Sequence, residues 1–144
     1  MNSFVKAGLV VGLFAVSLGT GAASAQKVKN TQQPPANEKT IQGLVRDVAC
    51  PIQSPETTAT DFNLQCAKQC VKAGSPLVIL TRKGTMYLPI SPSMPDKSVR
   101  ARLLPFVGKF VKVTGEVYER GGMRAIAVRK IQEEKNVHLK TDLQ

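Results

Sequence analysis

Two long stretches of alternating apolar and polar residues, joined by a pair of glycines, constrain the fold of this chain most strongly. Residues 109–119 place valines at alternate positions, and residues 123–131 follow directly after Gly121 and Gly122. Alternation with a period of two is typical of strands, and a glycine pair between two such stretches indicates a tight turn. The sequence therefore predicts a long antiparallel hairpin near the C-terminus.

The pattern upstream of this hairpin predicts three further strands and two helices. The expected strands cover residues 40–49, 77–81 and 85–90, and the expected helices cover residues 62–72 and 97–106, capped by Asp61 and Asp96. Five strands with a helix between the third and the fourth is the connectivity of the OB-fold, a Greek-key barrel. Gly43 and Gly115 suit strands that bend around such a barrel.

The predicted fold class is therefore mainly β. It is a five-stranded, OB-fold-like Greek-key barrel, with a helical insertion between the first and second strands and a helix between the third and fourth. An open antiparallel sheet with two helices is the competing fold.

The first 25 residues have the layout of a cleavable secretory signal peptide. Lys6 precedes an uncharged, mainly apolar run over residues 7–19, and residues 23–25 are Ala-Ser-Ala, with small side chains where a signal peptidase reads them. The run is shorter than the roughly 20 residues of a bilayer span. We expect cleavage before Gln26 and an exported protein, periplasmic or secreted, and an uncleaved N-terminal anchor is the alternative.

After cleavage about 120 residues remain, which is enough for one domain and too few for two. Residues 26–39 are polar and lack apolar periodicity, so we expect a flexible linker. The OB-fold-like domain is expected over residues 40–132. Residues 133–144 form a charged C-terminal tail, which we expect to fray.

The formal net charge of +10 favours anionic partners, such as an anionic surface or a component of the cell envelope. A basic but otherwise ordinary soluble surface is the alternative, because the cations are spread along the chain with acids among them. Nucleic acid is a poor candidate, since binding single strands needs stacking aromatics and the chain has no Trp, 2 Tyr and 5 Phe.

OB-folds bind oligonucleotides and oligosaccharides on the face of the second and third strands and at nearby loops. The candidate ligand-binding residues on and beside that face are four cations and two tyrosines: Arg82, Lys83, Tyr87, Arg100, Arg102 and Tyr118.

Several motifs together resemble a known group of proteins. They are Gly43-x-Val45-x-Asp47-x-x-Cys50, Cys66-x3-Cys70-Val71-x-x-Gly74-x-Pro76, Gly108-Lys109-x-Val111-x-Val113-Thr114-Gly115-Glu116-Val117, Gly121-Gly122 and Ala125-Ile126. Over residues 41–131 the chain resembles small exported bacterial OB-fold proteins with a three-cysteine pattern, which are largely uncharacterised. The resemblance implies the fold and the compartment, and it brings no catalytic residues.

The three cysteines are the main chemical feature. Cys50 is expected at the end of the first strand, and Cys66 and Cys70 are expected one turn apart on the first helix, so all three sulfurs can meet. In an exported protein the default is a disulfide from Cys50 to Cys66 or to Cys70, which staples the insertion to the barrel and is worth about 3 kcal/mol. Such a bridge leaves one thiol over.

A thiolate metal site is the second interpretation. Three sulfur ligands suit Zn(II) or Cu(I), although the cofactor is not decided by the sequence. Asp47 is a candidate further ligand, provided that the chain turns at Ala49, because Asp47 and Cys50 otherwise point to opposite faces of a strand. Met86 is a candidate ligand for copper, and His138, in the expected tail, is the lowest-ranked candidate.

Enzyme classes find little support. One histidine cannot build a Ser-His-Asp set, and a redox-active cysteine pair lacks the usual Cys-x-x-Cys spacing. Two hypotheses follow. The first is an exported binding or scaffold module with a metal- or thiol-dependent site. The second is a structural domain, or one that binds an anionic or saccharide ligand, whose cysteines form a stapling disulfide.

Overall fold

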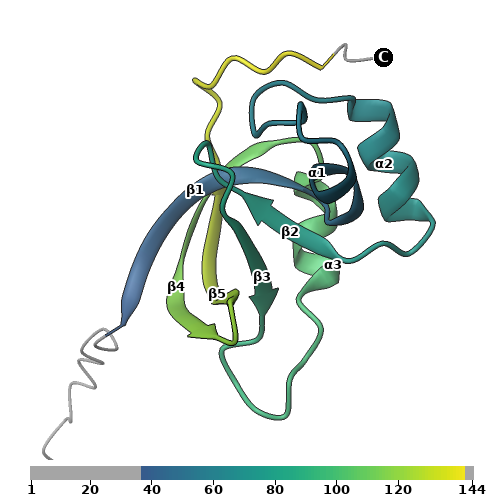
Figure 1. Cartoon of the computed structure of the whole chain (residues 1–144). Coiled ribbons are helices and arrows are strands. Elements are labelled where there is room, and N and C mark those ends of the chain that lie inside the picture. The colour runs from purple at the N-terminus through teal and green to yellow at the C-terminus, as the bar shows by residue number, and fades with distance from the viewer. Residues whose placement is uncertain (1–36, 142–144) are drawn as a thin grey trace, which may run out of the picture. The chain divides into compact units, whose positions relative to one another are not determined.

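The computed structural model describes residues 37–141, and these contain a closed five-stranded barrel (Figure 1). The strands are β1 (Glu38–Asp47), β2 (Leu77–Leu80), β3 (Met86–Ile90), β4 (Phe110–Arg120) and β5 (Met123–Glu133). The helices are α1 (Ala49–Gln53), α2 (Leu64–Lys72), α3 (Arg100–Leu103) and the 3₁₀-helix η1 (Leu104–Phe106). The predicted signal peptide, residues 1–25, lies outside the described residues.

The strands follow one another around the barrel in the order β1-β2-β3-β5-β4, and β4 pairs back with β1. The pairing of β3 with β5 is parallel, and the other four pairings are antiparallel. This closed order, with helices inserted after β1 and after β3, is the OB-fold arrangement. The predicted fold class is confirmed, and the open sheet is wrong.

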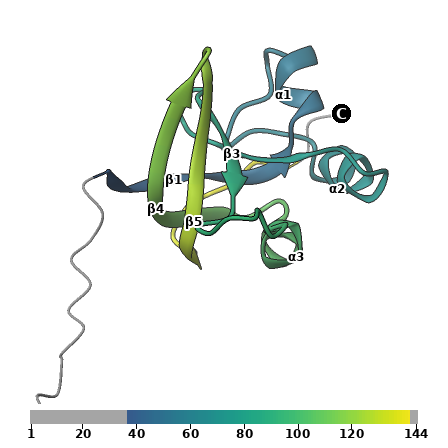
Figure 2. The same ribbon diagram turned by 90° about the horizontal axis from the view of Figure 1, so that it is seen from below.

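The predicted C-terminal hairpin is also present. β4 and β5 pair over their length, and Gly121 and Gly122 both have positive φ in the turn between them. Positive φ is a backbone conformation that glycine adopts without a steric cost, so the glycine pair fixes where the chain reverses. The hairpin lies on the side of the barrel away from α2 (Figure 2).

Gly43 and Gly115 lie where strands approach one another closely. A Cβ atom at Gly43 would lie 2.5 Å from the carbonyl oxygen of Leu80, and one at Gly115 would lie 2.0 Å from that of Ala127. The register of β4 and β5 shifts between Thr114 and Gly115, as a bulge requires. The two glycines therefore let the long strands curve without collision.

We expect Gly115→Ala to lower the free energy of unfolding by about 3 kcal/mol, at the upper end of the cost of overpacking, because a backbone atom has to move. Urea denaturation measures the loss. Gln42→Ala, at an exposed position of β1, is the control and should stay within about 0.5 kcal/mol of the parent. Equal stabilities for the two variants would contradict the close approach at Gly115.

Buried side chains form two clusters, one on each side of β1. Val45 belongs to the barrel interior, and its neighbour Leu44 belongs to an outer cluster between the barrel and the insertion. The interior cluster contains Val45, Val71, Leu77, Ile79, Val99, Leu103, Val111, Val113, Ile126 and Val128. The outer cluster contains Leu44, Ala59, Phe62, Ala67, Leu80 and Phe110. Since successive residues of a strand face opposite ways, β1 supports both clusters.

The helices are shorter than the sequence predicts. α2 begins at Leu64 and is capped by Asn63, not by Asp61, because the Asn63 side chain accepts the Cys66 amide at 2.6 Å. The second predicted helix, residues 97–106, is the pair α3 and η1, which starts three residues late. All the helices lie on one side of the barrel (Figures 1 and 2).

The predicted domain boundaries shift at both ends. β1 begins at Glu38, so the last two residues of the predicted linker belong to the barrel. β5 extends to Glu133. The predicted fraying of the tail is wrong for residues 137–141, because Val137 and Leu139 pack on the outer cluster and Lys140 pairs with the insertion at Asp61.

None of the helices between residues 37 and 141 has the length and apolarity that a membrane crossing requires.

Candidate metal centre

The three cysteines meet on the insertion, Cys50 from α1 and Cys66 and Cys70 from α2. The Sγ atom of Cys50 lies 3.2 Å from that of Cys66 and 4.0 Å from that of Cys70. All three sulfurs lie within 4.8 Å of one another, and each side chain is partly buried. The expectation that the sulfurs come together is therefore confirmed.

Helix α2 orients two of the thiols. Its buried residues are Ala67 and Val71, which face the two clusters. Cys66 and Cys70 lie four residues apart, so both project from one side of the helix, a turn from each other. The Asn63 cap fixes the first turn at Cys66. The packing of α2 and its Asn63 cap therefore orient the side chains of Cys66 and Cys70 toward α1.

Helix α1 brings the third thiol. The sequence predicts a strand through Ala49, but β1 stops at Asp47 and the chain turns into α1 at Ala49. The Asp47 carboxylate accepts the Cys50 amide at 2.8 Å through Oδ2, which stabilises the turn. Pro51 falls in the first turn of the helix, where a missing N–H costs nothing.

Asp47 positions Cys50 and does not itself join the cluster of sulfurs. It is fully buried, and its Oδ1 atom accepts from Arg46 Nη2 at 3.0 Å while Oδ2 accepts from Cys50. Among the described His, Cys, Asp and Glu residues, the one group close enough to share a metal ion is the three cysteines. The two other proposed ligands lie elsewhere: Met86 packs on the outer cluster and His138 is exposed.

The described chain contains no disulfide, and the three cysteines are free thiols. The shortest sulfur–sulfur distance, 3.2 Å, exceeds the roughly 2.05 Å of a covalent bridge. Cys50 and Cys66 are in direct contact, so the arrangement supports either a shared metal ion or a later oxidation.

The surroundings raise the pKa of two of the thiols, Cys50 and Cys70. The pKa of Cys50 is raised from 9.0 to about 11, mainly by burial, then by hydrogen bonds with Cys66 and Asp47. Burial is also the largest cause of the raised pKa of Cys70, followed by its hydrogen bond with Cys50. A bound cation acts against these shifts, because it stabilises the thiolate form.

The raised pKa predicts how Cys50 reacts with iodoacetamide, which attacks only thiolates. In metal-free reduced protein, the alkylation rate of Cys50 should rise with pH to a midpoint near 11, not near the ordinary 9.0. Peptide mass spectrometry measures the rate at each pH. The urea-unfolded chain is the control, with its midpoint at the ordinary value, and coincident midpoints in the two states would refute the prediction.

Sequence reasoning missed one residue beside the cluster, Arg46. Its side chain is 1% exposed and lies with its Cζ atom 5.7 Å from the centre of the Phe62 ring. Alternation along β1 places Arg46 on the same side as Leu44, under the insertion. The sequence did contain a signal for this residue: Arg46 is a cation at a position where the strand pattern predicts burial. A buried charge requires partners, so such a position indicates a polar contact.

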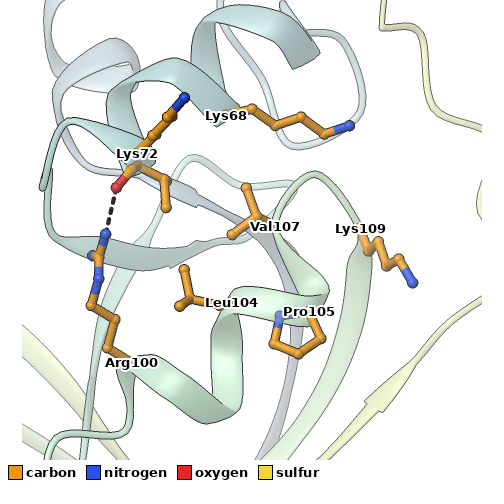
Figure 3. A pocket seen from close by; sticks show the side chains of 8 residues that line it. Lys68, Lys72, Arg100, Leu104, Pro105, Val107 and Lys109 are labelled. Atoms are coloured by element: carbon orange, nitrogen blue, oxygen red, sulfur yellow. Dashed lines mark hydrogen bonds between the residues drawn. The ribbon is translucent and has the colours of Figure 1, made fainter.

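The predicted ligand-binding face is not assembled as one surface, because Arg100 and Arg102 serve the fold. The Arg100 guanidinium donates to the carbonyls of Ser75 and Val71, tying α3 to the end of α2 (Figure 3). Arg102 donates to the carbonyls of Val128 and Arg129 at 3.0 and 3.1 Å, tying α3 to β5.

The other four candidates are spread over the barrel. Arg82 lies over the Phe110 ring at 5.1 Å, and Lys83 is exposed in the β2–β3 turn. Tyr87 packs against the barrel interior, while Tyr118 on β4 is 46% exposed and its pKa is raised by a hydrogen bond with Glu116. They offer no stacking platform.

A cavity of about 620 Å³ between α2 and η1 is instead lined by other cations together with Arg100. Figure 3 shows Lys68 and Lys72 on α2, Lys109 directly before β4, and apolar lining residues that include Leu104. Lys109 is paired with Glu133 at 2.8 Å. The cations that line this cavity come from α2, from the start of α3 and from the residue before β4. None of the three cysteines lines it.

Fold and site together define an OB-fold-like barrel with a three-thiol cluster on a helical insertion. Comparisons with protein-family models, with curated proteins and with solved structures give no significant match. The resemblance to small exported bacterial proteins stays a prediction.

Proposed function

We propose that this protein is an exported metal-binding module that holds one Cu(I) ion through Cys50, Cys66 and Cys70. The observation that supports it best is the meeting of three sulfurs within 4.8 Å. Soft thiolates select Cu(I), Zn(II) and iron–sulfur clusters among biological metals.

The sulfur positions suit a three-coordinate ion. With metal–sulfur bonds of about 2.3 Å, three sulfurs in a plane around the ion lie about 4 Å apart. The Cys50–Cys70 separation of 4.0 Å already matches this, and the Cys50–Cys66 separation of 3.2 Å has to widen by under about 1 Å. Side-chain rotation within the site supplies a movement of that size.

Cu(I) is preferred to a structural zinc ion because a closed zinc site takes four protein ligands. Both oxygens of the nearest carboxylate, Asp47, already accept hydrogen bonds from Arg46 and Cys50. A three-sulfur set without a fourth protein donor is complete for Cu(I) and leaves Zn(II) with an open position.

Export is part of the proposal and rests on residues 1–25, with their charged start, apolar run and small residues before Gln26. Outside the cytoplasm, free thiols are oxidised unless they are buried or bound. A metal ion shared by all three sulfurs protects them together, whereas a single bridge leaves one thiol exposed to oxidation.

The contact between Cys50 and Cys66 favours one second candidate, a stapling disulfide between these residues with no metal. Purifying the full-length protein without air, then measuring its metal by elemental analysis and its free thiols by alkylation in denaturant, separates the two. We expect one copper per chain after loading with Cu(I), and three free thiols after the metal is removed. If two of the three thiols are lost to a disulfide and the protein binds no copper, the proposed metal site is wrong.

A further inference from the structure

A small polar cavity lies beside the thiols. It encloses about 200 Å³ and is lined by Arg46, Cys50, Ser54, Glu56, Thr57, Asn63 and Cys66. Two of the three thiols line it, and Cys70 does not. The cavity therefore lies on one side of the sulfur cluster, between α1 and the start of α2.

Arg46 is the unusual member of this lining. Its guanidinium is buried, and Asp47 accepts one hydrogen bond from Nη2 at 3.0 Å. Its Nε and Nη1 atoms are buried with no hydrogen-bond partner among the described residues. A buried donor without an acceptor is costly, and native proteins keep such groups where a ligand, ion or water completes them.

We propose that this cavity binds a small carboxylate, held by the Arg46 guanidinium, whose other end reaches the sulfurs of Cys50 and Cys66. A planar fork of N–H donors matches a carboxylate, and charge-assisted pairs of this kind are the strong ones. Two sulfurs that line the cavity are also proposed copper ligands, so the carboxylate is tested in metal-free protein, where a failure of this site can be distinguished from a failure of the Cu(I) centre.

The charges around the cavity make the ligand's recognition specific. Asp47 balances the charge of Arg46, and Glu56 adds an exposed carboxylate that opposes an incoming anion. Affinity must therefore come from the unpaired donors rather than from a general positive field.

The test compares two alkylating reagents of nearly equal size, iodoacetate and iodoacetamide. In each reaction the thiol loses its proton to solvent, a sulfur–carbon bond forms, the carbon–iodine bond breaks and iodide leaves with the electron pair. Both reagents attack the same thiolate, so the ratio of their rates at one cysteine cancels its pKa and reports the effect of the carboxylate.

We expect iodoacetate to be favoured at Cys50 or Cys66 by at least about tenfold in this ratio, relative to the same cysteine in the urea-unfolded chain, as one strong charge-assisted hydrogen bond implies. The experiment uses full-length, metal-free, reduced protein, with peptide mass spectrometry as readout. Cys70 is the internal control and should show no preference for iodoacetate. Free acetate should slow the reaction of iodoacetate at Cys50 or Cys66.

Two variants complete the test. Arg46→Met should abolish the preference, and Glu56→Gln, at an exposed position where folding is not at risk, should increase it by removing the opposing charge. A ratio at Cys50 and Cys66 that equals that of the unfolded chain, or a Glu56→Gln variant without any increase, would overturn the proposal even where Arg46→Met fails to fold.

Discussion

Cys70→Ser should lower the affinity of the protein for Cu(I) by more than about 100-fold, since even residues behind a metal ligand cost 10–100-fold when they are changed. Competition with a chromophoric Cu(I) chelator in the absence of air measures the affinity. Cys70 is the informative choice because its sulfur lies 4.0 Å from Cys50, while Cys50 and Cys66 lie 3.2 Å apart and stay free to form a bridge.

The alternative makes the opposite prediction for the same variant. If a bridge between Cys50 and Cys66 were the whole purpose of the cysteines, Cys70→Ser would leave folding and oxidation unchanged, and no copper affinity would exist to lose. Met86→Leu is the matched control, because it removes a sulfur that packs on the outer cluster and leaves the three thiols in place. An unchanged copper affinity in Cys70→Ser would contradict the three-sulfur site.

The second large effect is expected from Phe62→Ala, which should lower the free energy of unfolding by about 3–5 kcal/mol. Phe62 is fully buried in the outer cluster and its ring lies under the Arg46 guanidinium. Removing it opens a cavity between the barrel and the insertion and strips the buried charge of its aromatic neighbour. Urea denaturation at constant pH, in reduced and metal-free protein, measures the change.

Met94→Ala is the control for Phe62→Ala, because Met94 is 88% exposed and should change stability by less than about 0.5 kcal/mol. A loss below about 1 kcal/mol in Phe62→Ala would mean that the insertion contributes little to the stability of the barrel.

The barrel was predictable because its signals are local. Alternation in β4 and the turn at Gly121 and Gly122 both depend on residues near in sequence. The proximity of Cys66 and Cys70 was predictable for the same reason, since a spacing of four on a helix places them together.

What the sequence did not predict depends on individual hydrogen bonds, which no residue pattern reveals, and on contacts of the C-terminal segment. The start of α1 at Ala49 depends on a carboxylate that accepts a backbone amide three residues later, and a strand pattern looks the same without that bond. The hydrogen bonds of Arg100 and Arg102 to backbone carbonyls could not be predicted either, because no side-chain pattern reveals such partners. Alternation at Val137 and Leu139 was the available signal for the packed tail.

That packed tail has a consequence for the order of assembly. The backbone of Lys140 forms hydrogen bonds with Thr60 and Phe62. The loop that precedes α2 is therefore held by a segment that follows all five strands in the sequence. Contacts between such distant segments form late, because closing a long loop costs entropy that only later contacts repay. The thiol-bearing insertion therefore depends on residues 137–141 for its final shape, and without them its three cysteines would lie on a less constrained loop.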